Sequence, residues 1–228
     1  MTEVRIAPIS GIPEVAPGHD LAELIVAALG KDGLLEGDVV VIAQKAVSKA
    51  EARVVDATDR LAAAHSESAR VLRRTGEMII SETRHGFVCA NAGVDQSNVE
   101  SGRLALLPLD PDASARRMRA RLAHLTGAEV AVIVADTFGR AWRIGQTNVA
   151  IGVAGIDPFV DYRGQTDAFG HELRATRICI ADEIAGAAEM VMGKSGGVCA
   201  ALVRGAGARV ARGAAADIVR PRSEDLFR

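Results

Sequence analysis

Apolar residues recur at helical spacing in four stretches of the chain. Between His19 and Leu29 they fall on one helix face, with Asp20 placed as the N-cap and Gly30 as the stop. The same spacing predicts helices over 59–74 and 180–192. It also predicts a helix from Asp110 to about Leu125, with Gly127 as its stop.

Continuous apolar runs between these stretches predict strands. Residues 38–43 and 129–135 are rich in β-branched side chains, which is typical of strands buried on both faces. Shorter segments predict further strands over 3–8, 78–82, 84–92, 104–109 and 198–203, followed by a poorly patterned tail over 206–228. This mixed order predicts an α/β fold (mixed α+β). We expect one domain over 1–228, because no repeat, long linker or internal boundary is visible.

Composition and charge narrow the possible partners. The 228 residues carry 27 Lys and Arg against 29 Asp and Glu, a net charge of -2, which argues against a nucleic-acid partner. No apolar run is long enough to span a membrane and the N-terminus lacks the pattern of a signal peptide, so we expect a cytoplasmic protein. Three well-separated cysteines and five scattered histidines predict neither a disulfide framework nor a zinc site.

Polar residues at the ends of predicted strands are the strongest candidates for chemistry. Asp95 lies with several amides in the turn 91–98, and Asp136 and Thr137 follow the buried run 129–135. Carboxylate, hydroxyl and amide oxygens suit Mg²⁺ or Mn²⁺, and ligands of α/β proteins gather at strand ends. The alternative is that Asp and Asn only form turns and caps there.

Lysine is scarce, with four residues in the whole chain. Lys45 and Lys49 directly follow the run 38–43, where ammonium groups could bind phosphates. A solvated strand end is the alternative interpretation. Lys194 lies in a Gly-Lys-Ser sequence, but Ala188 stands where a P-loop needs glycine, so this motif is rejected.

A long ordered set of motifs resembles the coenzyme F420-0:γ-glutamyl ligase family from Ile6 to about Gly205. The motifs are Gly11–Pro13, Val47–Glu51, Asn91–Val99, Leu107–Asp112 and, above all, Asp136–Gly152. The resemblance implies the α/β fold of that family and an intimate homodimer. It also implies an enzyme that joins F420-0 to L-glutamate through an acyl phosphate, using GTP and Mn²⁺ or Mg²⁺, with K⁺ as a further candidate cation, and releasing GDP and phosphate.

The resemblance also implies roles for individual residues. Asp95, Asp136 and Thr137 would bind metal, and Asp95, Asp136 and Lys49 would be catalytic. The nucleotide contacts would be Ile12, Pro13, Glu14, Val15, Gln44, Lys45, Lys49 and Asn98.

The chain departs from the family pattern at two positions. Lys194 stands where members often place an acidic or amide ligand for a second metal, and Ala52 stands where many carry Gly. Lys194 and the ending 222–228 look more like the actinobacterial bifunctional form, in which a flavin-binding domain follows the ligase domain. We therefore expect either a single-domain enzyme or the N-terminal domain of such a protein.

Two other classes of protein could use the same residues. One is a metal-dependent nucleotide phosphohydrolase, and the other is a nucleotide- or cofactor-binding module without turnover.

Overall fold

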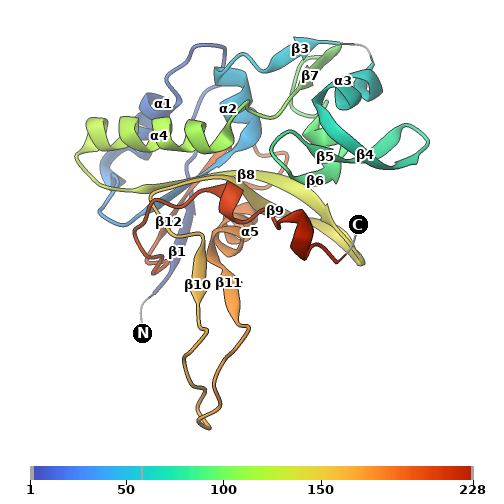
Figure 1. Ribbon diagram of the computed structural model, residues 1–228. Coiled ribbons are helices and arrows are strands. Elements are labelled where there is room, and N and C mark those ends of the chain that lie inside the picture. Colours follow the sequence, from blue (N-terminus) through green and yellow to red (C-terminus); the bar gives the residue numbers. More distant parts are fainter. Residues whose placement is uncertain (1–2, 58, 227–228) are drawn as a thin grey trace.

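A twisted five-stranded sheet forms the centre of the protein in the computed structural model, which describes residues 3–57 and 59–226 (Figure 1). Its strands lie in the order β1 (Arg5–Pro8), β12 (Ala200–Arg204), β2 (Val39–Ala43), β8 (Ala131–Arg140) and β9 (Arg143–Ala154). Only β2 and β8 are parallel neighbours; the other adjacent pairs are antiparallel. The mixed α/β class predicted from the sequence is confirmed.

Helices cover both faces of this sheet. Above it in Figure 1 lie α1 (Leu21–Leu29), α2 (Gln44–Ala50) and α4 (Pro111–Thr126), and below it lies α5 (Ile180–Met192). The β-branched residues of β2 alternate between the two cores, with Val40 facing the upper core and Val41 the lower. Both are fully buried, which explains why this strand is continuously apolar. Among the described residues, no helix is long and apolar enough to cross a membrane.

Smaller elements extend from the central layers. One lobe contains α3 (Arg60–Glu67), the sheet β4 (Ser68–Thr75), β5 (Met78–Thr83) and β6 (Val88–Ala90), and the pair β3 (Val54–Asp56) and β7 (Arg103–Ala105). A long hairpin projects downward from β10 (Phe159–Asp161) and β11 (Arg177–Cys179). Short 3₁₀ turns lie at η1 (Gly30–Asp32), η2 (Asn91–Gly93), η3 (Ala215–Asp217) and η4 (Arg222–Glu224).

Local sequence signals place several element boundaries correctly. Asp20 caps α1 by accepting from the N–H groups of Ala22 and Glu23, and Asp110 caps α4 by accepting from Ala113. Gly127 ends α4 in the left-handed conformation, as predicted. The helix predicted over 180–192 is confirmed, and the strand predicted over 198–203 is present as β12.

The helix predicted over 59–74 is wrong in its second half. It ends at Glu67, and Ser68–Thr75 forms β4, which pairs with β5. Two register shifts in this pair, between Ser68 and Arg70 and between Val71 and Arg73, interrupt the alternation of a regular strand. The mostly exposed strand therefore lacks the period of two by which it could be recognised.

The strand predicted to end at Ala135 is longer than expected. Its parallel pairing with β2 stops at Ala135, opposite Ala43, but β8 continues to Arg140 and returns as β9. The motif 136–152 is therefore a β-hairpin within the main sheet. Gly152 allows β9 to approach the start of α4, because a Cβ there would lie 2.3 Å from the carbonyl oxygen of Pro111.

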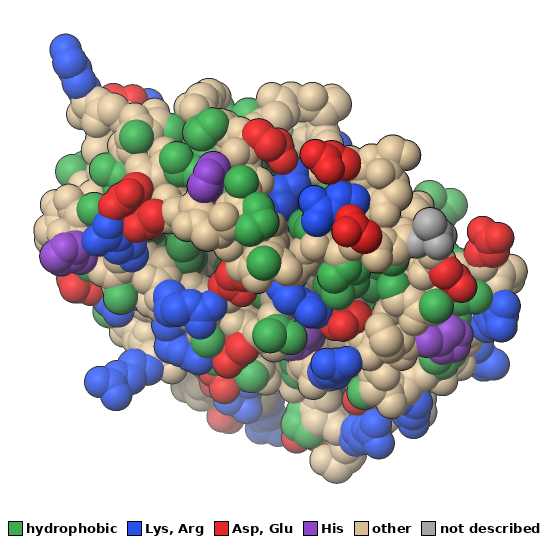
Figure 2. Space-filling model, turned by 90° about the horizontal axis from the view of Figure 1, so that it is seen from above, with side chains coloured by type: hydrophobic (Ala, Val, Ile, Leu, Met, Phe, Trp, Pro, Cys, Tyr) green, Lys and Arg blue, Asp and Glu red, His purple; other side chains and the backbone are tan. Residues whose placement is uncertain are grey.

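On the face seen in Figure 2, acidic and basic side chains are interspersed rather than separated into broad patches. This distribution agrees with the near-neutral net charge and offers no extended cationic surface on that face to a nucleic-acid backbone.

Candidate active site

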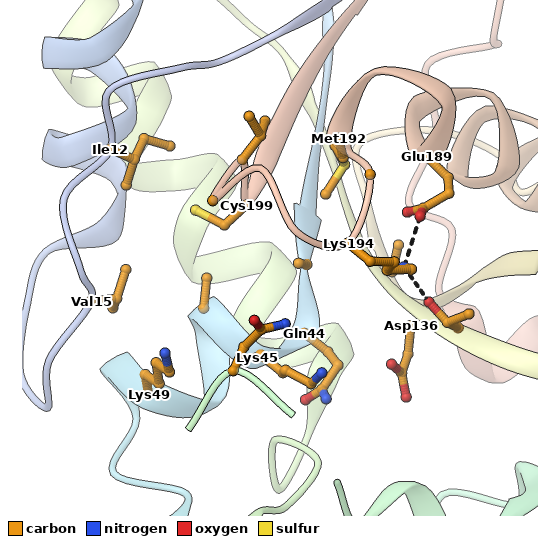
Figure 3. A pocket seen from close by; sticks show the side chains of 18 of the residues that line it. Ile12, Val15, Gln44, Lys45, Lys49, Asp136, Glu189, Met192, Lys194 and Cys199 are labelled. Atoms are coloured by element: carbon orange, nitrogen blue, oxygen red, sulfur yellow. Dashed lines mark hydrogen bonds and ion pairs between the residues drawn. The ribbon is translucent and has the colours of Figure 1, made fainter. Parts of the chain in front are cut away.

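A pocket of about 370 Å³ opens where the parallel pair β2 and β8 ends. This volume lies in the range of small-molecule sites, and the position outside the carboxyl ends of parallel strands is where α/β folds bind ligands. The loop before α1, the helix α2, the hairpin β8–β9 and the end of α5 all contribute to its wall (Figure 3).

Three of the four lysines line this pocket. Lys45 and Lys49 lie one helical turn apart on α2, and Lys194 follows the end of α5. Residues four apart lie on the same face of a helix, so the step from β2 directly into α2 presents both of its lysines to the cavity. The pocket thus offers three ammonium groups to a ligand, beside the carboxylates of Glu14, Asp136 and Glu189 that also line it.

The lysines of α2 are held by acidic partners. Lys45 forms an ion pair with Asp95 Oδ2 at 2.7 Å and donates to Ser97 Oγ, while Lys49 pairs with Glu14. Asp95 and Ser97 come from the turn 91–98 singled out in the sequence, so the fold brings that turn to the end of β2. Asn98, in the same turn and in the left-handed conformation, lines the pocket.

Gln44 has a buried hydrogen-bond donor without a partner. Its side chain is 1% exposed and lines the pocket; Oε1 accepts from the Ser48 hydroxyl at 2.9 Å, whereas Nε2 has no acceptor. An unsatisfied buried donor is costly, and a ligand acceptor that reached Nε2 would remove that cost. The residues predicted as nucleotide contacts, Ile12, Pro13, Glu14, Val15, Gln44, Lys45, Lys49 and Asn98, all line the same cavity.

The two predicted metal-binding carboxylates lie in different environments. Burial raises the pKa of Asp136 to about 7, against the lowering effect of the Thr137 backbone N–H and of the Lys45 charge. Partial burial also opposes ionisation of Asp95, but hydrogen bonds from Lys45 and Ser97 outweigh it and keep the pKa of Asp95 below its ordinary value. The negative charge of Asp95 also raises the pKa of Asp136.

The oxygen donors fit a divalent ion whose coordination shell is completed by the substrate. Within residues 3–57 and 59–226, no group of three or more His, Cys, Asp or Glu side chains is arranged to hold a metal ion. Mg²⁺ and its analogues are commonly bound through one or two carboxylates plus substrate phosphates and water. Asp95 and Asp136 could provide the carboxylates, beside the lysines that line the pocket. The metal roles of Asp95, Asp136 and Thr137 stay predictions.

A hydrogen-bond network around Lys194 forms the wall opposite α2. The Lys194 ammonium contacts Thr137 Oγ1 and Glu189 Oε1 (Figure 3), and Thr137 donates to Asn148 Oδ1 at 2.6 Å. Gly193 has a φ of 60° at the end of α5, a conformation that favours glycine, and it turns the chain toward the pocket.

Sequence reasoning gave no role to Asn148 or Glu189, although both line the pocket. Asn148 lies within the motif 136–152, and Glu189 is a carboxylate in the last turn of α5, whose other acidic residues, Asp182 and Glu183, lie in its first turn. Cys199 also lines the cavity, but burial raises the pKa of its thiol, so it is not poised as a thiolate nucleophile.

Comparisons with known proteins identify the family of the chain. Residues 11–205 match the model of the F420-0:Gamma-glutamyl ligase family. The coenzyme F420:L-glutamate ligase of Methanothermobacter thermautotrophicus is 42% identical over 249 aligned residues, covering 99% of this chain and 99% of the relative. The ligase of the same name from Archaeoglobus fulgidus is 39% identical over 221 residues, covering 89% of this chain and 88% of the relative. The one from Methanopyrus kandleri is 42% identical over 211 residues, with coverage of 84% and 82%. The chain therefore belongs to the F420-0:γ-glutamyl ligase family.

Proposed function

We propose that the protein forms an amide between the carboxylate of F420-0 and the amine of L-glutamate, at the expense of GTP. One observation supports this most strongly: three of only four lysines converge on one pocket, next to the carboxylate of Asp136. Lysines that converge beside a candidate metal-binding carboxylate are typical of sites for phosphoryl transfer. Catalysis of that reaction depends mainly on positioning the reacting groups and stabilising the charge that develops on them.

The pocket suggests an orientation for the nucleotide. Lys45, Lys194 and Asp136 define a charged end, while Ile12, Val15 and Cys199 lie on the wall at the other end (Figure 3). We place the phosphates at the charged end and the base near the loop 12–15. Gln44 Nε2 would donate to the nucleotide, which satisfies a group that has no partner in the free protein.

The proposed reaction has two steps. A carboxylate oxygen of F420-0 attacks the γ-phosphorus of GTP, the bond between phosphorus and the bridging oxygen breaks, and GDP leaves with that electron pair. The amine of glutamate then attacks the acyl carbon; the carbon–nitrogen bond forms, phosphate leaves and the amine loses a proton. The substrate carboxylate is itself the first nucleophile, so the chain needs no activated serine or cysteine.

Protein side chains would position charge in both steps. Lys45, held by Asp95, would bind phosphate oxygens, and Lys194 would face the transferred group, while Lys49, paired with Glu14, would contact the nucleotide nearer its base. A divalent ion held by Asp95 and Asp136, with the remaining lone pair of Thr137 Oγ1 in reach, would neutralise phosphate charge. We also propose a homodimer, the commonest closed assembly.

Product analysis tests this proposal. The protein is incubated with F420-0, L-glutamate, Mn²⁺ and GTP, and the mass of the deazaflavin product is measured. We expect a product larger by one or more glutamate residues, formed faster with GTP than with ATP. Release of phosphate from GTP at the same rate without F420-0 and glutamate, and without amide formation, would instead identify a phosphohydrolase. Nucleotide binding without turnover would identify a binding module.

A further inference from the structure

The side chain of Lys194 ends among oxygen atoms from three separate elements. Its ammonium donates to Thr137 Oγ1 on β8 at 2.6 Å, forms an ion pair with Glu189 Oε1 on α5 at 2.9 Å, and donates to Asn148 Oδ1 on β9 at 3.3 Å. The three N–H groups of lysine thus match three oxygens. A carboxylate, a hydroxyl and an amide carbonyl are also the oxygen ligands that hard metal ions take.

These oxygens are also linked to one another without the lysine. The hydroxyl of Thr137 donates to Asn148 Oδ1 at 2.6 Å, and Asn148 Nδ2 donates to Glu189 Oε2 at 2.9 Å. Asn148 is only 3% exposed, so packing limits its movement. The oxygen set is therefore preorganised, and removing the ammonium would leave three hard oxygens close together around an unbalanced carboxylate.

Stability alone is a weak explanation for this arrangement. The side chain of Lys194 is 58% exposed and that of Glu189 is 24% exposed, and ion pairs with such exposure contribute little to folding. All four residues line the candidate active site, and the positive charge of Lys194 acts on Asp136. The position of the ammonium thus matters mainly for what enters the pocket.

We propose that Lys194 is a tethered cation, whose ammonium takes the position of a second metal ion among Thr137, Asn148 and Glu189. The protein then uses one divalent ion, at Asp95 and Asp136, and a covalently attached charge on the other side of the phosphates. This inference rests on the proposed function, which brings those phosphates into the pocket. A tethered charge is in place before the substrate arrives and cannot dissociate.

Counting Mn²⁺ ions tests the inference. Bound Mn²⁺ per chain is measured by electron paramagnetic resonance of the free ion, without nucleotide or F420-0, for the wild type, Lys194→Glu and the control Lys31→Glu. Lys31 is exposed in η1 and does not line the pocket, so the control makes the same charge change elsewhere. We expect Lys194→Glu to bind one more Mn²⁺ per chain than the wild type, and Lys31→Glu to bind the same number as the wild type.

A second substitution locates the additional ion. Combining Lys194→Glu with Glu189→Gln should return the count to that of the wild type; an additional ion that persists in this double variant would overturn the inference. Lys194→Gln, which removes the charge and supplies an amide oxygen, serves if Lys194→Glu does not fold, and should also bind one more ion, with lower affinity. An unchanged count in the folded Lys194 variants would equally overturn it.

The ion count and the ligation assay test the two proposals separately. Because the titration contains no substrate, an additional ion in Lys194→Glu would support the tethered cation even if no glutamate were ligated. Conversely, an unchanged count in a chain that ligates glutamate would overturn this inference and leave the proposed function intact.

Discussion

Replacing Gln44 by methionine should separate ligand binding from folding. The change keeps the length of the side chain but removes Nε2, which has no acceptor, and Oε1, which accepts from Ser48. The Ser48 hydroxyl also lies 2.6 Å from the Leu106 carbonyl oxygen, so it keeps an acceptor in the variant. The substitution should therefore leave no new unsatisfied group in the core.

The two contributions to stability can be compared. An unsatisfied buried donor costs about 1–3 kcal/mol, and a neutral hydrogen bond contributes about 0.5–1.5 kcal/mol. Losing both should change the free energy of unfolding by about -0.5 to +2.5 kcal/mol. For a chain of this size the upper limit corresponds to a rise in melting temperature of about 5–10 °C. GTP should bind about 5-fold to 150-fold more weakly, because about 1–3 kcal/mol of interaction with the ligand is lost.

Thermal unfolding without ligand and calorimetry with GTP and Mn²⁺ provide the two measurements. Gln165→Met is the control, since Gln165 is exposed in the projecting hairpin and its amide donates to Asp161 O. We expect its GTP affinity to equal that of the wild type. Unchanged GTP affinity in Gln44→Met, or a clear loss of stability in the free protein, would refute the role assigned to this amide.

Two further predictions concern the metal site and the loop after α2. Asp95→Asn and Asp136→Asn should each abolish ligation and weaken Mn²⁺ binding while the fold is retained. Asn keeps the shape and turn-capping ability of Asp but loses its charge. Ligase activity within a few-fold of the wild type would refute the metal-binding role of the substituted residue. Ala52 has a φ of 55° just after α2, so Ala52→Gly should raise the free energy of unfolding by about 1 kcal/mol, or about 2–4 °C in melting temperature. Ala27→Gly, at an exposed position inside α1, should instead lower it by about 1 kcal/mol; a change of the same sign in both variants would contradict the explanation from backbone conformation.

The sequence predicted the central features because they depend on local patterns. Buried apolar runs identify β2 and the first half of β8, and Asp110 and Gly127 mark the ends of α4 by capping chemistry. Strand-end reasoning and the family resemblance named Lys45 and Asp95 as separate candidate site residues, and the structure joins them in an ion pair at 2.7 Å.

The missed features depend on contacts between distant parts of the chain. The strand β4 is defined by its pairing with β5, and bulges hide its periodicity. Glu189 and Asn148 acquire their place in the pocket only when α5 packs beneath β9, and neither position carries a local signal of that contact. The structure also gives Lys194 a set of partners that its Gly-Lys-Ser sequence could not predict.

An isotope-transfer experiment tests the central claim, ligation through an acyl phosphate, most directly. F420-0 labelled with oxygen-18 in its reacting carboxylate is incubated with the protein, GTP, Mn²⁺ and L-glutamate, and the released phosphate is analysed by mass spectrometry. If the carboxylate attacks the γ-phosphorus, the oxygen that joins carbon to phosphorus leaves with the phosphate, so each amide formed should yield one phosphate that carries the label. Labelled amide accompanied by unlabelled phosphate would contradict the account.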